Sequence, residues 1–341
     1  MNGIAWGSCW HAAKIASAPL VLHLSIQRRM SNNCLYCYQG LAADEKDFHR
    51  SCASKFFEEK EPPIFDLSRK DLEDVALTFI SRNAAVTGVQ PKLSLDLMND
   101  NGVKRLTVVG LWGNYILKPQ SNHFEQLPEN EDLTMHLAEI AEIKTVLHSL
   151  IRMSDGSLAY ITKRIDRHKK RKLHMEDMCQ LTGHLTEHKY RGSYEQIRKA
   201  FFSFSKQPGI DLTRYAEILL FSYLVGNADM HLKNFSILHK DKPGPVMSPA
   251  YDLVSTVIVN PDDKEETALT LNGKKNRITR KDFIALFNNL GLLPRQQENI
   301  FERLLSCENK WLAFINQSFL SPTMQAQYKE LIQLRISQLE D

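Results

Sequence analysis

Residues 226–234 read GNADMHLKN, and residues 248–252 read SPAYD. The two stretches place Asp229, then Asn234 five positions later, then Asp252. Phosphoryl transfer from ATP uses such a set, in which one aspartate accepts the proton of the attacking hydroxyl and the asparagine and the later aspartate hold Mg²⁺. Single Asp and Asn residues are common in turns, but three at these intervals predict the catalytic loop of a kinase.

The segments around this loop are predicted to hold it in place. Residues 215–225 are apolar at helical spacing and end before a glycine, which is suited to cap a helix C-terminus. Residues 235–239 and 246–250 read as the two strands of a hairpin. The hairpin would bring Asp252 back beside Asn234.

Two further side chains lie inside the loop itself. His231 follows the expected base by two residues and is predicted to brace the loop by hydrogen bonding. Lys233, directly before the asparagine, is a candidate to neutralise charge that develops on the transferred phosphate.

A kinase also needs a positive side chain on the phosphates of the nucleotide, and Lys118 is the candidate. It ends the apolar segment 115–118, which is predicted to be a strand. An acidic helix follows, and Glu131 on that helix is expected to pair with the lysine, as the corresponding lysine and glutamate do in protein kinases.

Residues 84–92, AAVTGVQPK, are predicted to be a turn that covers the phosphates, between a helix and the strand 93–97. With a single glycine the turn is a weak signal by itself, and an ordinary turn is the alternative. The residues expected to touch the nucleotide there are Thr87, Gly88, Val89 and Gln90.

Taken together, these motifs resemble the HipA family of bacterial toxin kinases. In chain order they are TGVQPK at 87–92, ILKP at 116–119, NE at 130–131, RIDR at 164–167, HMEDMCQ at 174–180, GNADMHLKN at 226–234 and AYD at 250–252. The resemblance implies an α+β, two-lobed protein-kinase-like fold with a small, mostly β N-lobe and a helical C-lobe. It also implies a serine/threonine protein kinase that phosphorylates an aminoacyl-tRNA synthetase and so inhibits translation.

Carried over position by position, the resemblance implies ATP and Mg²⁺ as cofactors, Asp229 as the catalytic base and Asn234 and Asp252 as metal ligands. The segment 159–163 would be the hinge that contacts adenine. The positions expected at the nucleotide are therefore Lys118, Thr87, Gly88, Val89, Gln90, Lys163, His231, Lys233, Asn234 and Asp252.

The chain departs from full-length HipA because too little sequence precedes Thr87 to contain the additional N-terminal subdomain of that protein. It resembles the short HipT branch, in which a separate small HipS-like protein supplies the subdomain and a DNA-binding HipB-like antitoxin completes the system. The family autophosphorylates two serines in the phosphate-covering turn. Here those positions are Ala85 and Thr87, so Thr87 is the expected acceptor. Phosphate on it would repel ATP.

A second constellation lies near the N-terminus. Cys34 and Cys37 form a C-x₂-C pair, and His49 and Cys52 form an H-x₂-C pair eleven residues later. Four such ligands in two close pairs suit a tetrahedral Zn²⁺ site. The alternatives are free thiols in a knuckle that keeps its shape without metal, or a disulfide, which a reducing compartment disfavours.

The chain is expected to divide into four parts. Residues 1–29 would be a non-native or disordered extension, 30–62 the Cys/His knuckle, 63–163 the N-lobe and 164–341 the C-lobe. The apolar run at 15–24 lacks the charge and cleavage site of a signal peptide. We therefore expect a cytoplasmic protein that does not span a membrane.

The composition agrees with these expectations. The chain has 341 residues, 43% of them hydrophobic, which is enough for two lobes. Its formal net charge of +3 is nearly neutral, so no direct, specific nucleic-acid binding is expected. The basic cluster 163–172 is interpreted as a solvated hairpin tip or as a docking patch for an acidic partner or for tRNA held by a synthetase.

Two other classes of function remain open at this stage. A small-molecule kinase uses an aspartate and an asparagine in the same catalytic roles and would differ only in its substrate. A nucleotide-binding pseudokinase in a repressor complex is the other alternative, although a scaffold has no chemical need for Lys118, Asp229, Asn234 and Asp252 together.

Overall fold

The computed structural model describes residues 32–72, 74, 92–110, 112–168 and 171–340. The described residues all belong to the unit Asn32–Asp341. The predicted extension at 1–29 and the predicted phosphate-covering turn at Thr87–Gln90 lie outside the described residues.

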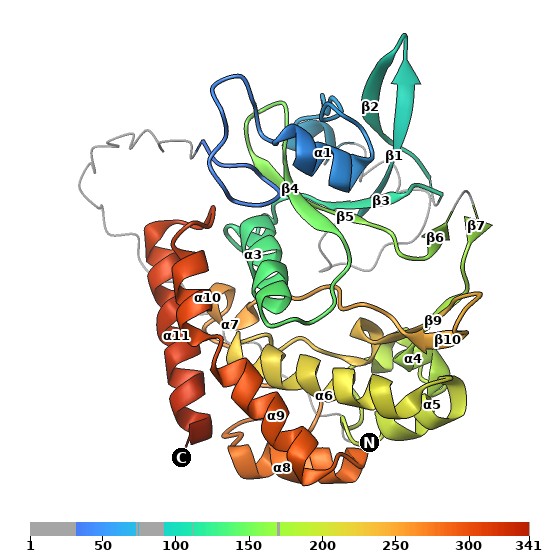
Figure 1. The fold of residues 1–341 in the computed structure, drawn as a ribbon, viewed down its shortest axis with the longest axis vertical. Coiled ribbons are helices and arrows are strands. Elements are labelled where there is room, and N and C mark those ends of the chain that lie inside the picture. The colour runs from blue at the N-terminus through green and yellow to red at the C-terminus, as the bar shows by residue number, and fades with distance from the viewer. Residues whose placement is uncertain (1–31, 73, 75–91, 111, 169–170, 341) are drawn as a thin grey trace, which may run out of the picture. The chain divides into compact units, whose positions relative to one another are not determined.

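A five-stranded antiparallel sheet forms the first part of the fold (Figure 1). Its strand order is β2-β1-β3-β5-β4. Asn101 and Gly102, both with positive φ, form the tight turn between the first two strands. The strands are β1 Leu93–Asp100, β2 Val103–Val108, β3 Tyr115–Lys118, β4 His148–Arg152 and β5 Leu158–Lys163.

Helix α3, Leu127–Ile140, packs against β4 and β5 of this sheet. On its other side it contacts α10, Glu308–Ile315, where the indole of Trp311 donates to the carbonyl of Leu137 at 2.8 Å. Every residue from Pro128 to Ala138 is buried, including several polar ones. Because buried polar groups need partners, this helix is expected to be tied down by specific bonds.

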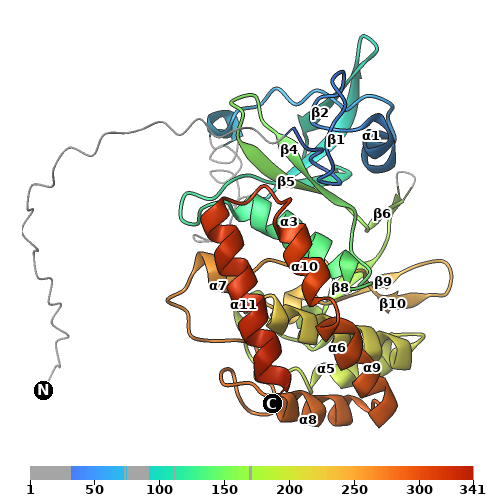
Figure 2. The ribbon, with the colours of Figure 1, turned by 60° about the vertical axis from the view of Figure 1, so that its left-hand side comes forward.

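The second part of the fold is mainly helical and is organised around α6, Pro208–Leu224 (Figure 2). Its residues Leu220, Phe221 and Leu224 are fully buried. Helices α5, α8, α9 and α11 contact it. The other α-helices among the described residues are α1 Arg50–Phe57, α4 Met178–Leu181, α5 Ile197–Phe204, α7 Thr256–Val259, α8 Arg280–Leu290, α9 Pro294–Leu305 and α11 Pro322–Glu340.

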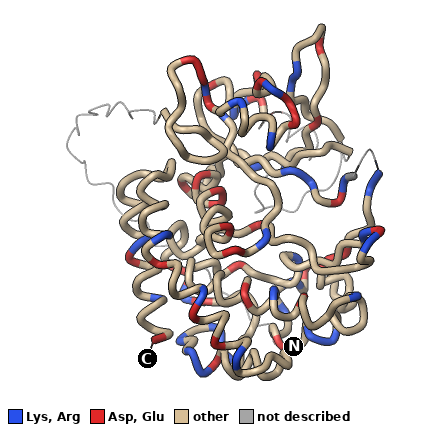
Figure 3. The backbone as a smooth tube through the Cα atoms, viewed as in Figure 1, with Lys and Arg blue, Asp and Glu red and all other residues tan. Residues whose placement is uncertain are grey.

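Two small sheets complete the structure. One has the order β10-β9-β8, formed by Pro245–Met247, Ser236–His239 and Met175–Asp177. The other pairs β6, Arg167–His168, with β7, Arg171–Lys172, so the basic cluster does form a hairpin. Figure 3 shows basic and acidic residues interspersed along the described chain.

The α+β architecture agrees with the prediction. Met175–Asp177 forms strand β8 because it pairs with β9. Helices α9 and α10 are separated at Ser306 and Cys307. None of the helices among the described residues is long and apolar enough to cross a bilayer.

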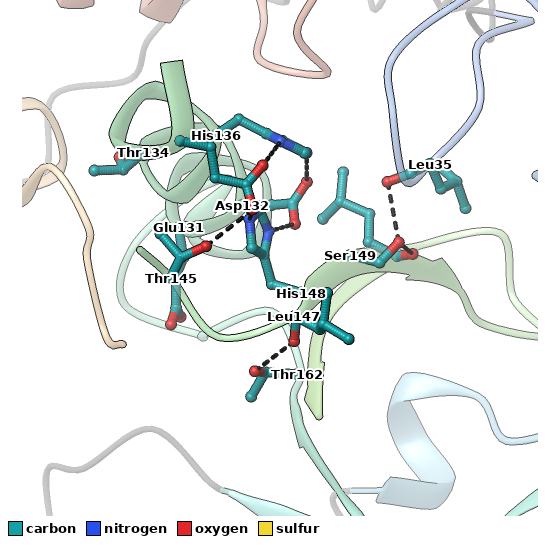
Figure 4. Close-up of polar contacts among 12 residues, drawn as sticks. Leu35, Glu131, Asp132, Thr134, His136, Thr145, Leu147, His148, Ser149 and Thr162 are labelled. Carbon is teal, nitrogen blue, oxygen red and sulfur yellow. Dashed lines mark hydrogen bonds and ion pairs between the residues drawn. The ribbon is translucent and has the colours of Figure 1, made fainter. Parts of the chain in front are cut away.

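A buried ionic cluster joins α3 to β4 (Figure 4). The Asp132 carboxylate lies between the rings of His136 and His148, with Oδ1 at 2.7 Å from His148 Nδ1 and Oδ2 at 3.5 Å from His136 Nε2. Tyr38 donates its hydroxyl to the same carboxylate at 2.8 Å. The cluster therefore holds the helix against both the sheet and the N-terminal segment.

The titration of His148 gives this cluster a pH dependence. Burial alone would lower the pKa of His148, but Asp132 and Glu139 outweigh it and raise the pKa to about 9. The unfolded chain takes up this proton near pH 6.5. The stabilisation is therefore complete below pH 6.5 and is lost as the pH rises through 9.

We expect the free energy of unfolding to fall between pH 6.5 and 9, by at most about 3 kcal/mol from this one group, because the pKa difference sets the size of the effect. In His148→Gln the part of the fall that comes from this group should disappear, and the part that comes from His136, whose pKa Asp132 also raises against its burial, should remain. Denaturant titrations at several pH values measure it, and His123→Gln, which changes an exposed histidine, is the control. A His148→Gln chain that keeps the wild-type slope would contradict the assignment.

Candidate active site

The loop that carries Asp229 is anchored at its start. Gly226 ends α6 with a φ of 69°, and a Cβ at this position would lie 2.5 Å from the side chain of Leu331. The N–H of Ala228 donates to the Thr256 hydroxyl at 2.9 Å, and the N–H of Val257 donates to the carbonyl of Gly226 at 3.1 Å. The predicted glycine cap is present, and α7 holds the loop that follows it.

Asp229 is partly exposed and has a hydrogen-bond donor that the sequence analysis missed. The hydroxyl of Tyr190 donates to its Oδ1 at 2.8 Å. The Asp229 amide donates to Oδ1 of Asn227 at 3.2 Å, which orients the residue within the loop. One carboxylate oxygen thus has a fixed donor, and Tyr190 comes from a segment 39 residues earlier in the chain.

The side chain of His231, within the loop, is buried. Its ring packs edge-to-face against Tyr190 at 5.1 Å, and its Nδ1 is buried without a hydrogen-bond partner among the described residues. Burial lowers the pKa of His231, while the charges of Asp229 and Asp252 act in the opposite direction. The ring therefore holds the loop by packing against Tyr190. The sequence predicts a hydrogen bond from this side chain, and none is made by Nδ1 among the described residues.

Asn234 ends a 3₁₀ turn, Leu232–Asn234, and is 7% exposed. Its Oδ1 is buried and accepts no hydrogen bond from any residue that the structure describes. An amide oxygen left without a donor is costly, and it is a preferred kind of ligand for Mg²⁺. The donor set of Asn234 and Asp252 thus fits a magnesium ion.

The hairpin of β9 and β10 brings Asp252 back to the loop. Met247 pairs with Ile237, and the N–H of Ser248 donates to the carbonyl of Ser236 at 2.9 Å. Beyond the strands, the Tyr251 hydroxyl donates to the carbonyl of Lys233 at 2.9 Å. The return that the sequence predicts is present, because Tyr251 contacts the residue before Asn234.

Asp252 belongs to a chain of alternating charges. Its Oδ1 accepts from Lys118 Nζ, and Lys118 Nζ also donates to Glu131 Oε1 at 2.5 Å, so the predicted pairing of Lys118 with Glu131 is present. Lys92 Nζ lies 3.0 Å from Asp252 Oδ2. Asp252 itself has a φ of 56°, a left-handed conformation that aspartate tolerates.

The charges in this chain stabilise one another. Burial alone would lower the pKa of Lys118, but Asp252 and Glu131 outweigh it and hold that pKa above its usual range. Burial alone would raise the pKa of Asp252, but Lys118 and Lys92 hold it well below its usual range. Burial raises the pKa of Glu131. Lys118 and Asp252 are therefore both charged at neutral pH.

A second bond, which the sequence analysis missed, ties α3 to the segment after Asp252. The side chain of Asn130 donates to the carbonyl of Ser255 at 2.8 Å and accepts from its N–H at 3.0 Å. Asn130 is fully buried. The residue directly before Glu131 thus ties the helix to the segment that follows Asp252.

Two predicted nucleotide residues have other partners. Lys233 Nζ pairs with Asp177 Oδ2 at 2.8 Å, the residue that caps α4. Lys163 Nζ pairs with Glu58. The predicted hinge segment 159–163 lies in β5, which pairs with both β3 and β4, and its contact with adenine stays a prediction. The chain leaves the sheet only after Lys163.

The four knuckle residues also come together. Cys34, Cys37, His49 and Cys52 place their ligand atoms within 4.8 Å of one another. They lie on the segment that precedes and begins α1, apart in sequence from the residues around Asp252.

Comparisons with known proteins assign the family. The profile of the HipA-like C-terminal domain matches residues 84–311. A putative kinase, Y4dM of Sinorhizobium fredii, is 34% identical over 187 residues, which are 51% of this chain and 45% of that protein. The serine/threonine-protein kinase toxin HipA of Shewanella oneidensis is 30% identical over 234 residues, 62% of this chain and 52% of the relative. The chain thus spans about half the length of the curated relatives it matches.

Solved structures show a similar fold. HipA of Shewanella oneidensis, in complex with HipB and operator DNA, matches 75% of this chain and 65% of its own with a TM-score of 0.61 and 24% identity. The Helicobacter pylori proinflammatory kinase CtkA matches 72% of this chain and 93% of its own with a TM-score of 0.51 and 14% identity. The fold is therefore protein-kinase-like, and the chain belongs to the family of proteins with a HipA-like C-terminal domain.

Proposed function

We propose that this chain is a serine/threonine protein kinase that transfers the γ-phosphate of ATP to a protein hydroxyl, and that it acts as the toxin of a toxin-antitoxin system. The chain of charges from Glu131 through Lys118 to Asp252 carries the proposal. Protein kinases need both a lysine–glutamate pair and a metal-binding aspartate in place before they are active. Here one lysine contacts both carboxylates.

The reaction follows from the residues of the loop. Asp229 would accept the proton of a serine or threonine hydroxyl while that oxygen forms a bond to the γ-phosphorus. The bond from the γ-phosphorus to the bridging oxygen breaks, and ADP leaves with the electron pair. Because Tyr190 donates to Oδ1, Oδ2 is the oxygen that we assign to the incoming hydroxyl.

The charged groups would stabilise the phosphates. Lys118 and Lys92 are positioned beside Asp252 and can turn toward an anionic phosphate that binds there. Asn234 and Asp252 would hold Mg²⁺, which neutralises phosphate charge when it is bound. Thr87, Gly88, Val89 and Gln90 would cover the phosphates.

The biological role is proposed from the family. The HipA relative from Shewanella oneidensis is named a serine/threonine-protein kinase toxin, and its solved structure contains HipB and operator DNA. We propose for this chain a DNA-binding HipB-like antitoxin, a small HipS-like antitoxin, an aminoacyl-tRNA synthetase as substrate and a place in the cytoplasm.

Asp229→Asn should reduce phosphate transfer by about 10² to 10⁴-fold, because an amide cannot accept the hydroxyl proton. ATP binding should persist, since Asp229 is not among the groups proposed to hold the nucleotide. Transfer of labelled γ-phosphate and equilibrium nucleotide binding measure the two quantities. Asp241→Asn, at the exposed tip of the β9–β10 hairpin, is the matched control.

The outcome separates the three classes of function. A pseudokinase would bind ATP and transfer no label in either variant. A small-molecule kinase would label a small alcohol and leave proteins unlabelled. Transfer that survives Asp229→Asn at the wild-type rate would refute the assignment of the base.

Autophosphorylation at Thr87 is expected to add one phosphate to the wild-type chain, because the threonine would lie next to the ATP phosphates. Intact-mass measurement after incubation with ATP and Mg²⁺ detects it. Neither Thr87→Ala nor Asp229→Ala should gain this mass. If the Asp229→Ala chain is modified as fully as the wild type, the phosphate comes from another kinase.

The synthetase substrate is tested in cells. Quantitative phosphoproteomics after brief expression of the wild-type chain should show one synthetase serine whose phosphorylation is absent when Asp229→Gln is expressed. The inactive variant controls for the effects of expression itself. If the new phosphoserines all lie on other proteins, the kinase assignment stands and the proposed substrate is wrong.

A further inference from the structure

The Cys/His knuckle, defined as Cys34, Cys37, His49 and Cys52, is a separate centre with no part in the proposed phosphoryl transfer. Its ligand atoms all lie within 4.8 Å of one another. Cys37 Sγ is 3.3 Å and Cys52 Sγ is 3.7 Å from His49 Nδ1. Three sulfurs and one ring nitrogen therefore surround a common point.

Two of these separations are close to those in the coordination sphere of zinc. With Zn–S of about 2.3 Å and Zn–N of about 2.0 Å, tetrahedral geometry places a sulfur and a nitrogen about 3.5 Å apart and two sulfurs about 3.8 Å apart. The two sulfur–nitrogen distances of 3.3 and 3.7 Å lie on either side of the first value. We propose that the knuckle is a closed, structural zinc site with three cysteine thiolates and His49 Nδ1 as ligands.

The orientation of the histidine ring supports the proposal. His49 Nε2 lies 3.0 Å from the carbonyl of Gly40. Because a carbonyl only accepts, Nε2 carries a hydrogen, and in the neutral ring Nδ1 then keeps a lone pair that faces the sulfurs. Histidines that bind metals are commonly held in this way by a backbone carbonyl.

A bound metal ion would also give all four side chains a partner, which hydrogen bonds among free thiols would not. The lone pair of His49 Nδ1 can accept only one S–H, although two of the sulfurs lie within 3.7 Å of it. One disulfide would use two of the three cysteines and leave the third without a partner. All the cysteines that the structure describes are free, and a zinc ion would bind the three knuckle thiolates at once.

The backbone of the knuckle forms a tight turn that presents the first two ligands. The N–H of Cys34 donates to the carbonyl of Gln39 at 2.8 Å, and the N–H of Tyr38 donates to the carbonyl of Cys34 at 2.9 Å. Tyr38 has a left-handed φ of 64°. A bulky residue in this conformation is strained, and ligation of the neighbouring Cys37 would stabilise it.

The knuckle contacts the proposed kinase through its turn. The carbonyl of Leu35 accepts from the N–H of Leu150 and from the Ser149 hydroxyl, each at 3.2 Å (Figure 4). Tyr38, which directly follows Cys37, donates to Asp132 and stacks on Phe314. The proposed zinc site would thus fix the turn from Cys34 to Tyr38, which contacts α3 at Asp132, the residue after Glu131.

The test is the metal content of the full chain, purified without chelators. We expect about one zinc per chain by mass spectrometry of the element, and a strong loss of zinc in Cys34→Ser and Cys52→Ser. Cys179→Ser and Cys307→Ser change buried cysteines outside the knuckle and should keep the metal. Zinc content that is equal in all five proteins, or absent from the wild type, would overturn the proposal.

Two measurements on the wild type remain decisive if the knuckle variants fail to fold. Cobalt(II) added to the metal-free chain should give an intense thiolate-to-cobalt charge-transfer band and the visible bands of tetrahedral cobalt. Chelator should lower Tm by several degrees, and zinc should restore it. A chain that binds no cobalt, or whose Tm is unchanged after the zinc is removed, would refute a structural metal site.

Discussion

The contact of Lys118 with two carboxylates is the constraint on which the rest of this structure depends. Lys118 is 4% exposed, and it joins Glu131 on α3 to Asp252 beyond β10. Removing one partner from a buried ion pair typically costs about 3 to 5 kcal/mol, because the charge that remains is uncompensated. Displacement of the sheet, of the helix or of the segment after the hairpin would therefore leave one of these buried charges without a partner. This is why a lysine at the end of a strand is buried here.

Helix α3 shows how the fold meets that constraint. Three of its buried polar residues bind different segments: Asn130 binds the backbone of Ser255, Asp132 binds Tyr38 and His148, and Thr134 contacts the hydroxyl of Tyr328 at 2.7 Å. A helix buried on an apolar stripe alone could rotate or slide at small cost. These bonds reach the sheet, the N-terminal segment and α11, so they fix the rotation of the helix and thereby the place of Glu131.

The sequence predicted the parts of the site that depend on local intervals. The loop from Gly226 to Asn234, the hairpin that returns Asp252 and the pairing of Lys118 with Glu131 all follow from spacing or from the motif. It did not predict contacts between residues that are far apart in the sequence. Tyr190 reaches Asp229 across 39 residues and Lys233 reaches Asp177 across 56 residues, and no local pattern marks either contact. The segment 159–163 belongs to a strand that pairs on both sides, and an apolar run does not show from sequence where such a strand ends and a connection begins.

The charge balance around Asp252 explains why Lys92 belongs to the site. Glu131 and Asp252 bring two negative charges, and Lys118 neutralises only one of them. Lys92, at 3.0 Å from Asp252, supplies the second positive charge. A divalent cation held by Asn234 and Asp252 would supply the same charge, and Lys92 would then be available for a phosphate oxygen. Lys92 ends the segment predicted to cover the phosphates, so in the proposed kinase this lysine would link that segment to the proposed metal site.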